Sequence, residues 1–184
     1  MADRGNFLPS ARNPRVPTGN PRIEVHPGKD AIVRFDPSRT FECVDACSWC
    51  CEHGVLLYEP DVYALADRES LATSTTMVRG ETFVARSPKD RDEHVAEDGH
   101  ACFYLDAEGR CSLQRAHDWK PTRCSVFPLC VEPHGDALAV DVREDAETHC
   151  EGLGVSDRRL IDHLDAFLPP QLWELPDPST RIEL

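Results

Sequence analysis

Long apolar runs are missing from this sequence. The longest run near its cysteine-rich region is Val55-Leu56-Leu57-Tyr58, which is far too short to cross a bilayer. The first twenty residues hold proline, asparagine, glycine and arginine around a single Phe7-Leu8 pair, so they lack the apolar core of a secretory signal. We therefore expect a soluble, cytoplasmic protein with no membrane partner, in which thiols stay reduced.

Lysine is also scarce. The 184-residue chain has 33 acidic and 20 basic side chains, a formal net charge of −13, and only three of the basic residues are lysine. Proteins that hold nucleic acid by its phosphates usually carry a basic face, so this balance argues against a nucleic-acid partner. An acidic, lysine-poor surface suits a halophilic cell with concentrated internal salt, and the arginine preference of a G+C-rich genome explains it equally well.

Cysteine, in contrast, is abundant. Four of the nine cysteines lie within residues 43–51, and the others follow singly, the full set being Cys43, Cys47, Cys50, Cys51, Cys102, Cys111, Cys124, Cys130 and Cys150. An isolated cysteine is most often a small buried apolar residue, but that reading does not explain such a dense group. Reduced thiolates at short spacing are soft ligands for zinc or iron. The cluster therefore predicts metal binding, by iron-sulfur clusters or by zinc.

The Cys50-Cys51 doublet bears on the number of sites. Neighbouring side chains diverge from the backbone, so we expect the two thiols to serve two different sites. Eight cysteines would complete two four-thiolate sites and leave one over. Cys102 and Cys111 flank a turn-forming stretch at residues 106–110, which predicts a hairpin that brings this pair into one site. The pattern does not assign the remaining cysteines to individual sites.

Three histidines lie within two positions of a cysteine, namely His53, His100 and His149. Because eight thiols already suffice, we expect these histidines to face solvent or to support the ligands, with His149 as the best additional ligand. The spacing of Cys43, Cys47 and Cys50 also matches the three-cysteine signature of radical S-adenosylmethionine enzymes. The alternating strands and helices that such enzymes need do not follow it.

The remaining pattern predicts a small, loop-rich α+β domain stapled by metal, with short antiparallel strands and about three helices. We expect a flexible arm at residues 1–22, a metal-binding domain at 23–168 and a tail at 169–184. The predicted strands are 31–35, 54–58, 82–85, and 129–131 paired with 138–142. The predicted helices are 60–70, 112–119 and 156–168, the last capped by Ser156, and residues 86–100 read as a solvated loop.

The cysteine order, together with Lys120-Pro121-Thr122-Arg123-Cys124 and Phe127-Pro128, resembles the YkgJ-like cysteine-cluster family, a CxxCxxCC zinc- or iron-chelating domain. The resemblance spans about residues 41–154. It implies metal chelation by Cys43, Cys47, Cys50, Cys51, Cys102, Cys111, Cys124 and Cys150, with Cys130 left over. The chain departs from the family in the wider first spacing, in Lys120 where arginine is usual, and in an arginine before Cys124 instead of after it.

Three functions are compatible with these observations. The first, which we favour, is a redox or cluster-carrying protein, because the thiolates exceed what one structural zinc requires. The second is a zinc-stapled module that binds a protein partner. The third is an enzyme such as a methyltransferase or maturation factor. One branch of the family is similar to flagellin lysine methylases, but this chain lacks room for a methylase region, and no nucleotide loop or catalytic triad supports an enzyme.

Overall fold

The computed structural model describes residues 19–44, 47, 49–52, 54–89 and 98–179, and within these ranges it confirms the α+β class. The strands are β1 (Arg22–His26), β2 (Lys29–Val33), β3 (Thr75–Val78), β4 (Glu81–Val84), β5 (Arg86–Pro88), β6 (His100–Cys102), β7 (Leu129–His134) and β8 (Ala137–Val142). The helices are α1 (Glu59–Ala66), α2 (Leu71–Ser74), α3 (Ser112–His117), α4 (Thr122–Val126), α5 (Glu144–His149) and α6 (Leu164–Phe167). Three 3-10 turns, Trp49–Cys51, Leu160–His163 and Pro170–Glu174, complete the described elements.

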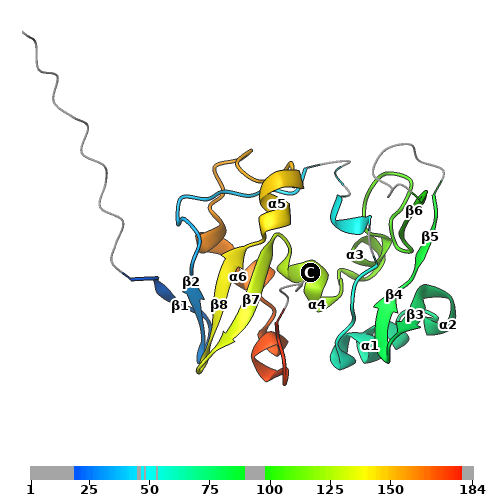
Figure 1. Cartoon of the computed structure of the whole chain (residues 1–184), viewed down its shortest axis with the longest axis horizontal. Helices are drawn as coiled ribbons and strands as arrows, with labels where there is room; N and C mark the ends of the chain where they lie inside the picture. The colour runs from blue at the N-terminus through cyan, green and yellow to red at the C-terminus, as the bar shows by residue number, and fades with distance from the viewer. Residues whose placement is uncertain (1–18, 45–46, 48, 53, 90–97, 180–184) are drawn as a thin grey trace, which may run out of the picture.

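One four-stranded sheet, in the order β1-β2-β8-β7, forms the first half of the molecule (Figure 1). Two antiparallel hairpins make its outer pairs, and the predicted pairing of residues 129–131 with 138–142 is confirmed. The two hairpins meet through a parallel contact of β2 with β8, in which Ala31 is opposite Leu138. The sheet therefore joins chain segments that lie on either side of most of the cysteines.

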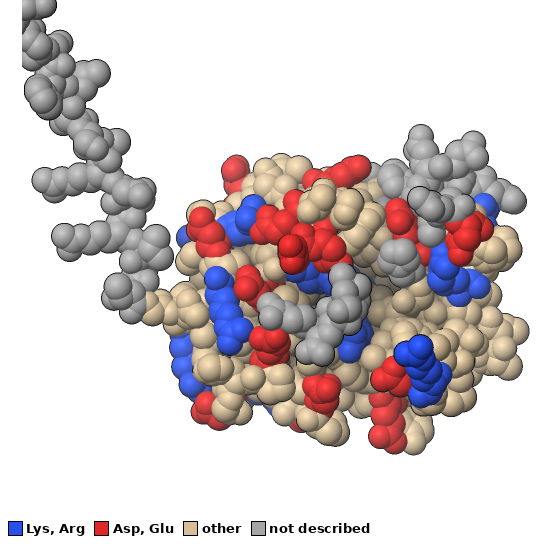
Figure 2. All heavy atoms as spheres, viewed as in Figure 1, with Lys and Arg blue, Asp and Glu red and all other residues tan. Residues whose placement is uncertain are grey.

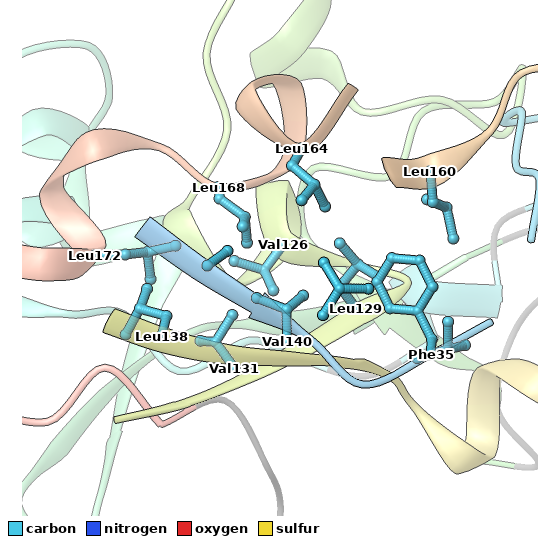
Figure 3. Packing of buried hydrophobic residues seen from close by; sticks show 13 residues of the cluster. Phe35, Val126, Leu129, Val131, Leu138, Val140, Leu160, Leu164, Leu168 and Leu172 are labelled. Atoms are coloured by element: carbon cyan, nitrogen blue, oxygen red, sulfur yellow. The ribbon is translucent and has the colours of Figure 1, made fainter. Parts of the chain in front are cut away.

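The larger core covers one face of this sheet. Four leucines at intervals of four residues, Leu160, Leu164, Leu168 and Leu172, are at most 3% exposed. They lie over the strand side chains Val131, Leu138 and Val140, with Phe35 and Val126 beside them (Figure 3). Each such buried side chain contributes about 1.5–3 kcal/mol of burial free energy. The segment expected to be a tail thus contributes Leu172 to the core.

A second half, formed by residues between the two hairpins, lies beside the sheet (Figure 1). It contains α1, α2, α3 and the two-stranded pairs β3-β4 and β5-β6. Its core has five buried side chains, Leu57, Leu65, Val84, Tyr104 and Leu113. In Figure 1, α4 lies between the two halves, and it packs on β7 and α6 of the first. The helix that carries Cys124 therefore sits at the junction.

The predicted helix over 156–168 is wrong in its first part. Residues 158–160 are instead held against the segment before the cysteine motif: the amide of Phe41 donates to the carbonyl of Arg158 at 2.9 Å, and the amide of Leu160 donates to Arg39 at 2.9 Å. Because of this extended pairing, helical structure begins only at Leu160, with the 3-10 turn. Ser156 is therefore not its N-cap. The predicted apolar spacing of the leucines is confirmed.

Two other predictions need correction. The charged stretch 86–100 was expected to be a loop, but β5 at its start pairs with β6, which begins at His100, and Arg86 forms an ion pair with Asp98 at 2.7 Å. Residues 90–97 lie outside the described residues.

The stretch 54–58 was predicted to be a strand, but it forms a single bridge, from Leu56 to Phe83. Of the expected arm, only residues 19–22 are described, and Arg22 begins β1.

The charge of the chain is visible on its surface. On the face in Figure 2, acidic side chains gather over α5, whose first turn carries Glu144, Asp145 and Glu147. Among the residues that the structure describes, no helix is long and apolar enough to span a membrane.

Candidate metal centre

All nine cysteines lie within the described residues, and none of them forms a disulfide bond there. The first of them, Cys43, is placed by a short antiparallel contact between segment 40–42 and segment 152–154. The amide of Glu42 donates to the carbonyl of Gly152 at 3.0 Å, and the amide of Gly154 donates to Thr40 at 3.0 Å. Because Cys150 ends α5 just before this segment, the contact brings the first and last predicted ligands to the same part of the molecule.

Gly152 makes that contact sterically possible. A Cβ atom at this position would lie 2.4 Å from the carbonyl oxygen of Glu42 and 2.9 Å from the ring of Phe41. Real Cβ atoms do not come that close to backbone oxygen, so any side chain here must push segment 40–42 away. The glycine is therefore required by backbone packing beside Cys43 and Cys150.

We expect Gly152→Ala to lower the free energy of unfolding by about 2 kcal/mol, because overpacking at a closed contact costs this much. Urea denaturation measures the change. Glu151→Ala, at the exposed neighbouring position, is the matched control and should leave stability unchanged. If the two variants are equally stable, segment 40–42 can move away from a side chain at position 152 without lowering the free energy of unfolding.

The Cys50-Cys51 doublet lies in the 3-10 turn at Trp49–Cys51, and the amide of Glu52 closes this turn on the carbonyl of Trp49 at 3.1 Å. The two sulfurs are 4.0 Å apart. The expected divergence of these side chains is therefore wrong, because neighbours in a helical turn do not alternate between opposite faces as they do in a strand. Contact with the Cys51 thiol lowers the pKa of Cys50 to about 7, while the pKa of Cys51 is raised well above its ordinary range by the same contact and by burial.

Four cysteines from separate elements lie close enough for their charges to interact. Cys51 ends the 3-10 turn, Cys102 ends β6, Cys111 precedes α3 and Cys124 lies in α4. Burial and then the charge of Cys111 raise the pKa of Cys102 to about 11. Burial, then Cys102, Cys50 and Cys111, raise that of Cys124 well above its ordinary range. We call Cys51, Cys102, Cys111 and Cys124 the inner thiol group.

The predicted pairing of Cys102 with Cys111 rests on a turn and not on a complete hairpin. Leu105 and Cys111 form a single bridge, and the amide of Asp106 donates to the carbonyl of Arg110 at 2.9 Å. Cys102 itself pairs with Arg86 on β5. The turn nevertheless brings the two thiols close enough for their charges to interact, as the sequence predicts.

Three further cysteines, Cys43, Cys47 and Cys150, line a cavity of about 90 Å³ that Cys50 and Cys124 also border. The pKa of Cys150 is raised, mainly by burial and further by the charges of Cys47 and Cys50. We call Cys43, Cys47 and Cys150 the outer thiol group. Cys50 lines the same cavity as the outer group, and its charge also acts on Cys124 of the inner group.

Aromatic side chains and one lysine form the rest of this cavity. Trp49 stacks on His149 with ring centroids 5.1 Å apart and contacts Phe127 at 5.9 Å. Lys120 lines the cavity, and its positive charge favours the thiolate forms of Cys50 and Cys124. Sequence reasoning missed this role of Lys120, although its place four residues before Cys124 could have suggested it. A larger hollow of about 420 Å³ beside Asp106 and Arg115 is open to solvent and has no thiol in its lining.

The ninth thiol lies elsewhere. Cys130 is buried on β7, 6% exposed, and its charge acts on the Arg143 guanidinium.

The histidines near the cysteines are candidate additional ligands. The ring of His149 stacks on Trp49, and Nδ1 of His100 lies 2.8 Å from the carbonyl oxygen of Asp98. His53 lies outside the described residues. The structure thus places the eight predicted ligands around the inner and outer groups and Cys130 in the sheet.

Within the described part of the chain, no three cysteine, histidine or acidic side chains stand close enough together to hold a metal ion as they are. Thiol sites often close only when the ion draws the ligands in, because a preformed cage of thiolates is electrostatically unfavourable. The raised pKa values of Cys51, Cys102, Cys124 and Cys150 reflect burial together with that repulsion. A bound cation would reverse both effects by stabilising the thiolate forms.

Comparison of the chain with family models, with curated proteins and with solved structures gives no significant match.

Proposed function

We propose that this protein holds metal in two neighbouring thiolate sites, with iron-sulfur clusters favoured over zinc, and that it serves in redox or cluster-dependent chemistry. The observation that carries the proposal is that five thiols from distant parts of the chain line one cavity, Cys43, Cys47, Cys50, Cys124 and Cys150, with the sulfur of Cys51 4.0 Å from that of Cys50. Four thiolates match the ligand number of a structural zinc and of a common iron-sulfur cluster.

The donor set supports a soft metal. Every predicted ligand is sulfur, and hard cations such as Mg²⁺ and Ca²⁺ prefer oxygen. When a metal is bound, Cys51, Cys102, Cys111 and Cys124 would hold it at the inner group, and Cys43, Cys47 and Cys150, with Cys50 of the same cavity, at the outer one. Lys120 and Lys89 would offset part of the negative charge that the thiolates bring, because their charges already favour the thiolates of Cys50 and Cys102 respectively.

The deciding experiment is an analysis of metal and acid-labile sulfide, with a visible spectrum, on protein purified without oxygen. Iron with sulfide would support a cluster protein. Zinc without sulfide would make the sites structural and favour a module that binds a protein partner. Protein that contains neither, and that takes up neither metal under reducing conditions, would overturn the proposal.

Separate replacement of the doublet is a sharper test of the ligands. We expect Cys50→Ser and Cys51→Ser each to lower the metal content, because each thiol interacts with other cysteines of the centre. Cys130→Ala is the matched control, since this thiol lies in the sheet, and it should retain the full metal content. Unchanged metal content in both doublet variants would exclude Cys50 and Cys51 as ligands.

A further inference from the structure

After the larger core, the chain runs back to the junction of the two halves. Leu172 is 0% exposed in that core. The next residues leave it: Pro176 and Asp177 are exposed, and Pro178 is buried again. We call residues 175–179 the C-terminal strap. The strap is therefore anchored at its start and buried at its end, with an exposed link between.

Two side chains from different parts of the molecule hold the end of the strap. The hydroxyl of Tyr58, just before α1, lies 3.1 Å from the carbonyl oxygens of both Pro178 and Ser179. Nη2 of Arg123, in α4, donates to the carbonyl of Ser179 at 2.9 Å, and the guanidinium lies over the Tyr58 ring, 5.3 Å from its centroid. The strap thus contacts the second half through Tyr58 and helix α4 through Arg123.

The hydrogen bonds of this contact are few. A hydroxyl carries one proton, so Tyr58 can donate to only one of its two carbonyl neighbours at a time. The buried Nε of Arg123 has no hydrogen-bond partner among the residues that the structure describes. Each hydrogen bond contributes only modestly to stability, because water replaces it on release. The end of the strap can therefore detach while Leu172 stays in its core.

The parts that the strap joins carry cysteines of the inner thiol group. Cys102 and Cys111 belong to the second half, and Cys124 directly follows Arg123 in α4. The charges of Cys102 and Cys111 act on Cys124. A shift of the second half relative to α4 would therefore change the distances between these thiols.

From these contacts we propose that the C-terminal strap is a releasable latch between the two halves. While Tyr58 and Arg123 hold the strap, the second half stays against α4. When the end of the strap detaches, the second half moves away from α4 and takes Cys102 and Cys111 with it. The inference does not depend on the proposed metal binding, because backbone carbonyls and two side chains other than cysteine make the contacts that carry it.

Hydrogen exchange on the protein as purified, followed residue by residue by NMR, tests the latch. The reporter is the amide of Thr122, which donates to the Asp61 carboxylate of α1 at 3.0 Å and loses that acceptor when α1 moves away. Pro178→Asp places a charge at the buried end of the strap. We expect it to speed exchange at Thr122 about tenfold, which corresponds to about 1.4 kcal/mol. Pro176→Asp, in the exposed link, is the matched control and should change nothing.

A second pair of variants makes a smaller change at the contact itself. Tyr58→Phe removes only the hydroxyl, and it should speed exchange at Thr122 about fivefold, the effect of losing one hydrogen bond of ordinary strength. Tyr63→Phe is its matched control, because the Tyr63 hydroxyl is exposed and donates to Glu59 within α1 at 3.3 Å. This control should leave exchange at Thr122 unchanged.

Amides of β7 and β8 are the reference for global unfolding and should keep their protection in all four variants. Unchanged exchange at Thr122 in Pro178→Asp would overturn the latch, and so would equal effects of Pro178→Asp and Pro176→Asp. Equal acceleration at Thr122 and in β7 and β8 would overturn it as well, because the strap would then belong to one cooperative unit. Protein that binds no metal would overturn the proposed function alone.

Discussion

Chelation of the metal is expected to unfold the half of the molecule that contains α1, α2, α3 and β3–β6, while the four-stranded sheet persists. The two halves have very different cores: thirteen buried side chains pack on the sheet, and five fill the other half. The smaller half therefore buries less apolar surface to offset the entropy of ordering its backbone, so it depends more on further cross-links.

Metal bound at the inner thiol group would supply such cross-links, since its members come from the 3-10 turn at Trp49–Cys51, from β6, from the start of α3 and from α4. A site saturated a thousandfold above its dissociation constant stabilises the folded state by about 4 kcal/mol. Hydrogen exchange with and without chelator measures the effect segment by segment. Amides of α1 and α3 should lose protection, and those of β7 and β8 should keep it.

A Cys111→Ser variant is the control for chelation. Its second half should already exchange fast, and the chelator should change it little. Unchanged protection of α1 and α3 after complete metal removal would show that the five-residue core is sufficient alone.

The second large effect is expected from Asp61→Ala. Asp61 is 2% exposed, and its carboxylate accepts hydrogen bonds from the backbone amide of Thr122 at 3.0 Å, from the Thr122 hydroxyl at 2.7 Å and from the amide of Tyr58 at 3.2 Å. It thereby links α1 to α4, and so the smaller half to the helix that carries Cys124. Removal of the carboxylate leaves three donors without their acceptor.

We expect Asp61→Ala to lower the free energy of unfolding by about 3 kcal/mol, because a buried donor left unpaired costs about 1–3 kcal/mol. Urea denaturation of the metal-loaded protein measures this loss. Asp67→Ala, at the exposed end of the same helix, is the control and should change stability by less than about 0.5 kcal/mol. Comparable losses in the two variants would contradict the linking role of Asp61.

Burial raises the pKa of Asp61 above its ordinary 3.8, despite the opposing hydrogen bonds from Thr122. The folded protein therefore keeps this proton at a pH where the unfolded chain has lost it, and the contribution of Asp61 to stability falls as pH rises from 3.8 through the folded pKa. Asp61→Asn removes this dependence. Its stability relative to the unchanged protein should therefore rise across that interval and then level off, and a relative decrease would contradict the assignment.

The sequence predicted the parts of the fold that depend on local pattern. The hairpin of β7 and β8 follows from two apolar runs around Gly135, and the leucine spacing after residue 160 follows from helical periodicity. The extended pairing of residues 158–160 with segment 39–41 could not be predicted, because the two segments are far apart in the chain. The hydrogen bonds between Asp61 and Thr122 could not be predicted either, because these residues are also far apart in the chain.

The candidate centre was predictable in composition but not in arrangement. Cysteine spacing predicted metal binding, the family resemblance implied the set of eight ligand candidates, and the turn before Cys111 predicted its charge interaction with Cys102. The division into inner and outer groups depends on where β6, α4 and α5 bring their thiols, and no local pattern specifies that. The role of Gly152 likewise became visible only from its contact with Glu42.

The parallel contact between β2 and β8 has a consequence for biosynthesis. Ala31 pairs with Leu138, so the sheet cannot close until the residues up to β8 have left the ribosome. The smaller half and the inner thiol group, whose last member is Cys124, are complete by then. The outer group needs Cys150, which emerges later still. During synthesis, the outer thiol group would therefore be the last one able to receive a metal.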